Sequence, residues 1–113
     1  MAIMKLIIDN LNEFYSGKVR LVKTLMKREH ASEYPELLKW CLQMLYFDGS
    51  HWIEICRIDN YPHKKHIGSH VHYFGKDDAK RQHLSFTEAE AEIKRVSARI
   101  LLERFGEIID LGD

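Results

Sequence analysis

Positions near the start of the chain recur at helical spacing. Intervals of three and four residues separate them, and Gly17 follows as a stop signal. The members of this pattern are Ile3, Leu6, Ile7, Asn10, Leu11 and Phe14. It predicts a short N-terminal helix. Residues 18 to 28 fit either a strand face or a helix face, and the glycine before them favours a strand.

The clearest local signal is a β-hairpin in the middle of the chain. Residues 39 to 47 and 50 to 58 flank Asp48-Gly49, a dipeptide suited to tight turns that need a positive φ. A two-residue loop predicts three cross-strand pairs, which are Leu45 with Trp52, Gln43 with Glu54, and Cys41 with Cys56. The two cysteines then suit a disulfide if oxidised, and reduced thiols are the expected state in a cytosolic protein.

Side-chain alternation predicts which face of this hairpin is buried. The expected core face carries Leu42, Met44, Ile53 and Ile55. The opposite face carries Trp52, Glu54, Cys41 and Cys56.

A further strand is expected from about Ile67 to Phe74. Burial of its aliphatic set, Ile67 and Val71 with Tyr73, turns His70, His72 and Phe74 towards the other side. If this strand joins the same sheet as the hairpin, both histidines share a face with Trp52 and Glu54.

The C-terminal part of the chain predicts a helix. Residues 76 to 83 are polar and indicate a loop, after which Ser85 and Glu88 have the spacing of a capping box. An apolar stripe at intervals of three and four follows, made of Phe86, Ala89, Ile93, Val96 and Ile100. Gly106 ends the helix, and the acidic tail is expected to fray, with Ile108, Ile109 and Leu111 available to dock on a partner.

Together these elements predict an α+β fold. We expect residues 1–113 to form a single domain with an antiparallel sheet of three to five strands, covered by the C-terminal helix and a short N-terminal helix. A chain of 113 residues that is 45% hydrophobic fits one domain with one core.

Formal net charge is zero, so no global field attracts nucleic acid. Because no secretory signal or membrane-length apolar run occurs, we expect a cytoplasmic protein without a membrane partner.

Four histidines within ten residues are the part of the composition that folding needs do not explain. They are His63, His66, His70 and His72, and they follow Arg57-Ile58-Asp59-Asn60 closely. Histidine titrates near neutrality, binds metals and acts as a general acid or base. The cluster therefore marks a candidate site.

One interpretation of the cluster is metal-free acid/base cleavage of RNA by a possible endoribonuclease. The 2′-hydroxyl of the RNA is the nucleophile, and histidines move the protons. The candidate catalytic residues are His70, His72, His63 and His66, with Glu54 as an orienting carboxylate. The candidate substrate contacts are Arg57, Lys64, Asp59, Asn60 and Trp52, of which Arg57 and Lys64 meet the phosphate and Trp52 stacks on a base.

Two other interpretations stay open. His70 and His72 share one strand face at positions i and i+2, so with His63 or His66 they could bind a divalent zinc, manganese or nickel ion in a metal-binding domain or a metal-dependent hydrolase. Alternatively, the histidines are ordinary loop and surface residues, and the open sheet face of a non-catalytic module binds a protein.

The segments Tyr46-Phe47-Asp48-Gly49 and Arg57-Ile58-Asp59-Asn60-Tyr61-Pro62-His63-Lys64-Lys65-His66 resemble the TumE-like proteins of toxin-antitoxin modules. The resemblance covers roughly residues 38 to 100. It implies the toxin component of such a module, with a helix-turn-helix antitoxin protein as partner. The positions that match the family pattern are Arg57, Asp59, Asn60, His63 and His66. RNA and a second copy of the chain in a homodimer are the other expected partners.

Overall fold

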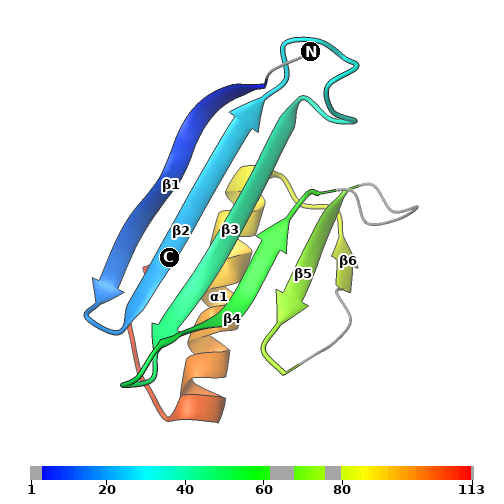
Figure 1. The fold of residues 1–113 in the computed structure, drawn as a ribbon. Coiled ribbons are helices and arrows are strands. Elements are labelled where there is room, and N and C mark those ends of the chain that lie inside the picture. The colour runs from blue at the N-terminus through cyan, green and yellow to red at the C-terminus, as the bar shows by residue number, and fades with distance from the viewer. Residues whose placement is uncertain (1–3, 62–67, 76–79, 113) are drawn as a thin grey trace.

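The protein is described by a computed structural model that covers residues 4–61, 68–75 and 80–112 (Figure 1). One antiparallel sheet holds the strands in chain order, and one helix lies against a single face of it. The elements are β1 (Lys5–Ser16), β2 (Val19–Lys27), β3 (Leu38–Phe47), β4 (Trp52–Asp59), β5 (Ser69–Tyr73), β6 (Lys80–Gln82) and α1 (Phe86–Phe105). The predicted α+β class is confirmed. Within the described ranges, the sheet has five strands of five or more residues and a sixth, β6, of only three.

The core lies between α1 and the sheet. The helix buries Ala89, Ile93, Val96 and Leu101, as the apolar stripe predicts in part. The sheet side of this core is fully buried at Val19, Leu21, Leu42, Met44, Ile55, Cys56, Ile58 and Val71. Each buried Leu or Ile contributes about 1.5–3 kcal/mol of transfer free energy. Burial on this face leaves the opposite face of the sheet for polar side chains.

The predicted ends of α1 are confirmed. The Ser85 hydroxyl accepts a hydrogen bond from the Glu88 backbone at 3.1 Å, and the Glu88 carboxylate accepts one from the Ser85 backbone at 2.9 Å. Gly106 follows the last turn in a left-handed conformation with a φ of 67°, which glycine adopts without strain. These caps depend on neighbouring residues alone.

The predicted N-terminal helix is wrong, because the segment forms the edge strand β1. Its pairing with β2 is antiparallel and shifts register between Leu6 and Ile8, between Ile8 and Leu11, and between Phe14 and Ser16. Asn10 has a positive φ of 46°. Each irregularity interrupts the two-residue alternation of a regular strand. The apolar residues of β1 do not share one face, because Leu6 and Phe14 lie opposite Met26 and Arg20 whereas Leu11 lies opposite Lys23. Their spacing of three and four residues along the chain imitates a helix. The favoured strand over residues 18 to 28 is confirmed as β2.

The predicted register of the central hairpin is wrong. The connection spans residues 48 to 51, where the Asp48 carboxylate accepts hydrogen bonds from the backbones of Ser50 (2.8 Å) and His51 (2.9 Å). The first pair is therefore Phe47 with Trp52. This side-chain cap lengthens the turn beyond the two residues that the Asp-Gly dipeptide indicates.

A bulge at Ile55 then changes the side-chain alternation of β4. Leu45 pairs with Glu54 and Met44 pairs with Cys56, so Ile55 is the extra residue between them. Beyond the bulge Cys56 lies on the core face. The predicted pairing of the two cysteines is contradicted, because Cys41 pairs with Asp59 and both thiols are free.

Three smaller expectations also change. The predicted loop over residues 76 to 83 contains the short strand β6, and residues 76–79 lie outside the described part. Phe74 packs on the helix side, with its ring centroid 5.2 Å from that of Phe105. The acidic tail docks on its own domain, since Leu111 is only 3% exposed and Glu107 accepts a hydrogen bond from the Tyr46 hydroxyl at 2.9 Å. Among the described residues, no helix is long and apolar enough to cross a membrane.

Candidate functional site

The candidate site lies on the sheet face turned away from α1, called the open face below. The residues of β3, β4 and β5 that the register places on it are Lys39, Cys41, Gln43, Leu45, Phe47, Trp52, Glu54, Arg57, Asp59, His70 and His72. Strand β5 joins the hairpin's sheet, with His72 opposite Arg57 and His70 opposite Asp59. Both histidines therefore share a face with Trp52 and Glu54, as strand alternation predicts.

The Asp59 carboxylate is the centre of the polar contacts. Its Oδ2 lies 3.2 Å from Nε of Arg57 and 3.4 Å from Nε2 of His72. Its other oxygen, Oδ1, accepts a hydrogen bond from the backbone of Tyr61 at 3.0 Å. Only 4% of this side chain is exposed, whereas Arg57 is 35% exposed. A buried carboxylate is stable when cations and backbone donors surround it in this way.

Arg57 connects this centre to a second carboxylate. Its terminal nitrogen lies 3.5 Å from Oε1 of Glu54, and the other oxygen of Glu54 accepts a hydrogen bond from the Gln43 amide at 2.8 Å. The guanidinium plane is thus held between Asp59 and Glu54. A positioned guanidinium is suited to a phosphate or to an anionic transition state.

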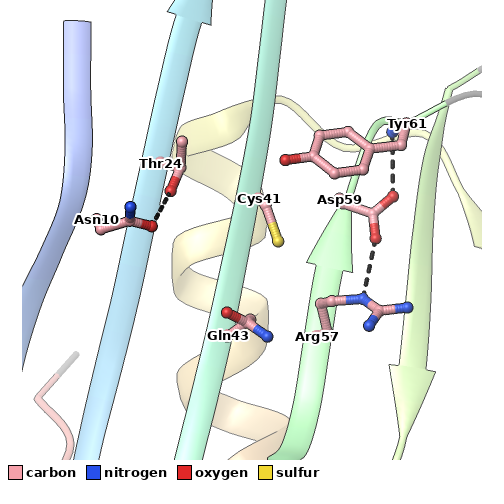
Figure 2. A pocket seen from close by; sticks show the side chains of 7 residues that line it. All are labelled: Asn10, Thr24, Cys41, Gln43, Arg57, Asp59 and Tyr61. Atoms are coloured by element: carbon pink, nitrogen blue, oxygen red, sulfur yellow. Dashed lines mark hydrogen bonds and ion pairs between the residues drawn. The ribbon is translucent and has the colours of Figure 1, made fainter. Parts of the chain in front are cut away.

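A hollow of about 540 Å³ opens over Arg57, Asp59 and Gln43. It is lined by Asn10, Thr24, Cys41, Gln43, Arg57, Asp59 and Tyr61. Figure 2 shows Arg57 and the Tyr61 backbone meeting the Asp59 carboxylate, while the Tyr61 ring extends from the end of β4 towards β3. The volume lies in the range of small-ligand sites.

The remaining titratable groups around the hollow are poor nucleophiles. Burial and, to a smaller extent, the Asp59 carboxylate raise the pKa of the Cys41 thiol to about 12. Burial also raises the pKa of Tyr61. Because a thiolate and not a thiol attacks substrates, Cys41 stays neutral at physiological pH. The arrangement is suited to acid/base chemistry by an imidazole and a carboxylate.

The structure separates the two strand histidines by burial. His72 is 19% exposed in its side chain and touches Asp59, whereas His70 is only 3% exposed. His72 is therefore the histidine that a substrate can reach from the open face. The other predicted contacts from the cluster, His63, Lys64 and His66, lie outside the described residues.

Asn60 does not face the open site. Its side chain donates to the Leu38 carbonyl at 2.6 Å and to the Glu36 carboxylate at 3.1 Å, and accepts from the Trp40 backbone at 2.8 Å. The residue is 4% exposed. Contrary to the prediction of a substrate contact, Asn60 locks the end of β4 to the beginning of β3.

Trp52 lies at the other end of the open face within an aromatic group. The guanidinium carbon of Arg20 lies 4.4 Å from its ring centroid, and the rings of Phe14 and Phe47 lie 6.5 Å and 5.4 Å away. Sequence reasoning missed Arg20 and Phe14, which come from β2 and β1. Their proximity to Trp52 depends on the register of the four strands β1 to β4, and no local motif records it.

A metal site is not evident in the part of the chain that the structure covers. There, no group of three or more His, Cys, Asp or Glu side chains is arranged so that it could hold a metal ion. The metal-binding interpretation therefore rests on His63 and His66, whose positions are not described. Elemental analysis of protein purified without a histidine tag addresses it directly.

Comparisons with protein-family models, with curated proteins and with solved structures found no match. The likeness to TumE-like proteins rests on the residues quoted for it, and the site is interpreted from its own geometry.

Proposed function

We propose that the protein is the toxin component of a toxin-antitoxin module and cleaves RNA in the cytoplasm by metal-independent acid/base catalysis. The observation that carries the proposal is the Asp59 carboxylate, which lies at once against Arg57 and His72 on an open sheet face. The resemblance to TumE-like proteins supports the module, with a helix-turn-helix antitoxin as partner.

In the proposed reaction, His72 takes the proton from the 2′-hydroxyl of RNA. The 2′ oxygen attacks the adjacent phosphorus, and the bond from phosphorus to the 5′ oxygen breaks. That leaving oxygen receives a proton from the protonated His72, or from His63 or His66. The products are a 2′,3′-cyclic phosphate and a 5′-hydroxyl, so protons and electron pairs balance without an oxidant or a metal.

The two partners of His72 have separate tasks. Asp59 orients the imidazole and stabilises its protonated form, a role that the sequence alone had indicated for Glu54. Arg57 stabilises the extra negative charge of the pentacovalent transition state, while Glu54 and Gln43 hold the guanidinium in place. A general acid or base in this position contributes about 10²–10⁴-fold to the rate.

The decisive experiment for this proposal is the analysis of cleavage products. Purified wild-type protein is incubated with a single-stranded RNA, with and without a chelator, and the ends of the fragments are identified by mass spectrometry. We expect 2′,3′-cyclic phosphate ends in both conditions. Cleavage that stops in chelator and returns with zinc, manganese or nickel supports the metal-dependent alternative, and intact RNA in every condition contradicts both.

A second candidate function, a non-catalytic protein-interaction module, is favoured by the exposed apolar side chains of edge strand β1. Leu6, Ile7 and Leu11 are each about half exposed, and Phe14 is 61% exposed. Such residues on an unpaired edge suit a docked protein strand or a second copy of the chain. This alternative is supported if the protein leaves RNA intact and forms a stable complex with an antitoxin. That complex should survive His72→Ala and be lost in Leu11→Asp.

A further inference from the structure

Two cations on the open face lie over aromatic rings and, in the part of the chain that the structure covers, contact no carboxylate. The guanidinium of Arg20 lies 4.4 Å from the Trp52 ring centroid, and Nζ of Lys39 lies 4.8 Å from that of Tyr61. Among the described residues, no Asp or Glu oxygen lies within ion-pair distance of either cation. In contrast, Arg57 between them contacts two carboxylates. The open face thus holds two positive charges that no carboxylate among the described residues neutralises.

These two cation-aromatic pairs lie at opposite ends of the open face, as measured along β3. Lys39 stands at the start of β3, and Trp52 pairs with Phe47 at its end. The eight intervening steps correspond to about 26 Å at the usual rise of a strand. Gln43, which pairs with Arg57, lies midway between them. The hollow over Arg57 and Asp59 therefore has one cation-aromatic pair on each side of it along the strand direction.

An alternation of aromatic rings and uncompensated cations matches the chemistry of single-stranded nucleic acid. Unstacked bases offer flat faces to rings and to guanidinium planes, while their phosphates pair with cations. A duplex hides its base faces in its own stack, and the Asp and Glu side chains of an acidic peptide have no flat rings to place against Trp52. Phe14, at 61% exposure, meets the Trp52 ring edge-to-face and adds a second exposed ring beside it.

We propose that the open face is a binding track for single-stranded nucleic acid. One base and its phosphate lie against Arg20 and Trp52, another base and phosphate lie against Lys39 and Tyr61, and the strand between them crosses the hollow beside His72. The assignment of RNA as the natural ligand rests on the proposed function. The track itself rests on stacking and charge, which do not depend on the 2′-hydroxyl.

The test uses single-stranded DNA as a probe that cannot be cleaved through a 2′-hydroxyl. A fluorescent oligothymidylate of about ten nucleotides, within the usual site sizes of single-strand grooves, is titrated with the full-length wild-type protein. We expect saturable binding and at least tenfold weaker binding of a duplex of equal length. Trp52→Ala is expected to raise the Kd about 5- to 150-fold, the range measured for the loss of one stacked base.

Charge variants give a second readout that loss of packing does not imitate. Each phosphate contact contributes about 0.7 to the slope of log Kd against log salt for a single strand, so Arg20→Gln and Lys39→Gln should each lower the slope by about that amount. Arg99→Gln, which removes an exposed charge from the far side of α1, should leave it unchanged. Ile108→Ala is the apolar control for Trp52→Ala, because Ile108 is 88% exposed on the tail. Thermal unfolding of each variant verifies that it is folded.

The outcomes separate this inference from the proposed function. The track is overturned if Trp52→Ala and the exposed-ring variant Phe14→Ala both bind with a Kd within twofold of wild type. Equal affinity for duplex and single strand also overturns it. Binding as expected without cleavage of RNA upholds the track and contradicts the catalytic proposal. Cleavage of RNA at rates unaffected by Trp52→Ala and Arg20→Gln upholds catalysis and overturns the track.

Discussion

Nε2 of His72 lies 3.4 Å from Oδ2 of Asp59, across the pairing of β4 with β5. Asp59 pairs with His70 in the register, and its side chain reaches diagonally to His72. The contact is possible because the Ile55 bulge inverts the alternation of β4 and turns Asp59 to the open face. A histidine and a nearly buried carboxylate in this relation are the basis of the proposed chemistry.

Asp59→Asn tests whether the charge of the carboxylate matters beyond the shape of the side chain. The amide keeps the size of the side chain but removes the charge that stabilises a protonated His72 and pairs with Arg57. We expect RNA cleavage to fall about 100-fold, within the range of one acid/base group, and stability to fall by about 1–3 kcal/mol. Single-turnover rates and urea unfolding measure the two effects separately. A variant that is fully folded and fully active contradicts the role given to Asp59.

Arg57→Lys tests whether the guanidinium geometry matters beyond its charge. Lysine keeps the positive charge but cannot contact Glu54 and Asp59 together. The expected loss in cleavage rate is about tenfold or more, with a larger loss of 10²–10³-fold for Arg57→Ala. If Arg57→Lys cleaves at the wild-type rate, Arg57 acts only as a general charge.

Asn60→Ala should affect stability and not chemistry. The change removes three hydrogen bonds that join the end of β4 to Leu38, Trp40 and Glu36 and leaves buried backbone groups without partners. We expect a loss of about 2–4 kcal/mol in the free energy of unfolding, with unchanged cleavage per folded molecule. Glu36→Ala removes one of these bonds and should cost less than about 1.5 kcal/mol. A large fall in cleavage rate with unaltered stability would restore Asn60 as a substrate contact.

Both cysteines should react slowly in the folded protein. Burial raises the pKa of Cys41 and of Cys56 to about 12, so at pH 8 only about one thiol in 10⁴ is ionised. We expect labelling by a disulfide reagent to be about a thousandfold slower than in urea, where the pKa returns to about 8.5. Rapid native labelling of Cys41 contradicts the raised pKa of its thiol.

The same thiols predict a loss of stability in alkali. Between the unfolded and folded pKa values, the folded protein holds thiol protons that the unfolded chain has released. The contribution of these thiols to the free energy of unfolding is therefore fully present below about pH 8.5 and is lost as pH rises towards 12. Urea unfolding at pH 7 and pH 10 should show a lower midpoint at pH 10, and Cys56→Ala should reduce the difference.

Features that depend on adjacent residues could be predicted from the sequence. The capping box of Ser85 and Glu88 and the stop at Gly106 involve neighbours on the chain, and α1 forms where they indicate. Strand alternation was also sufficient to place His70 and His72 on one face with Trp52. The helix caps need no knowledge of distant pairing, whereas the shared face also assumes that β5 joins the sheet of the hairpin.

Features that depend on irregular backbone could not be predicted. The bulges of β1 imitate a helical period, and the Ile55 bulge moves Cys56 to the core and Asp59 to the open face. The contacts of Asp59 with His72 and of Arg20 with Trp52 follow from register across strands. A sequence pattern fixes neither the position of a bulge nor the register that follows from it.

The most direct test of the central claim compares His72→Ala with His51→Ala in one cleavage assay. His51 lies on the turn between β3 and β4 with 72% of its side chain exposed, so its loss controls for removing a histidine. The proposal predicts a fall of at least about 100-fold in cleavage by His72→Ala and none by His51→Ala. Equal activity of the two folded variants would contradict a catalytic role for His72.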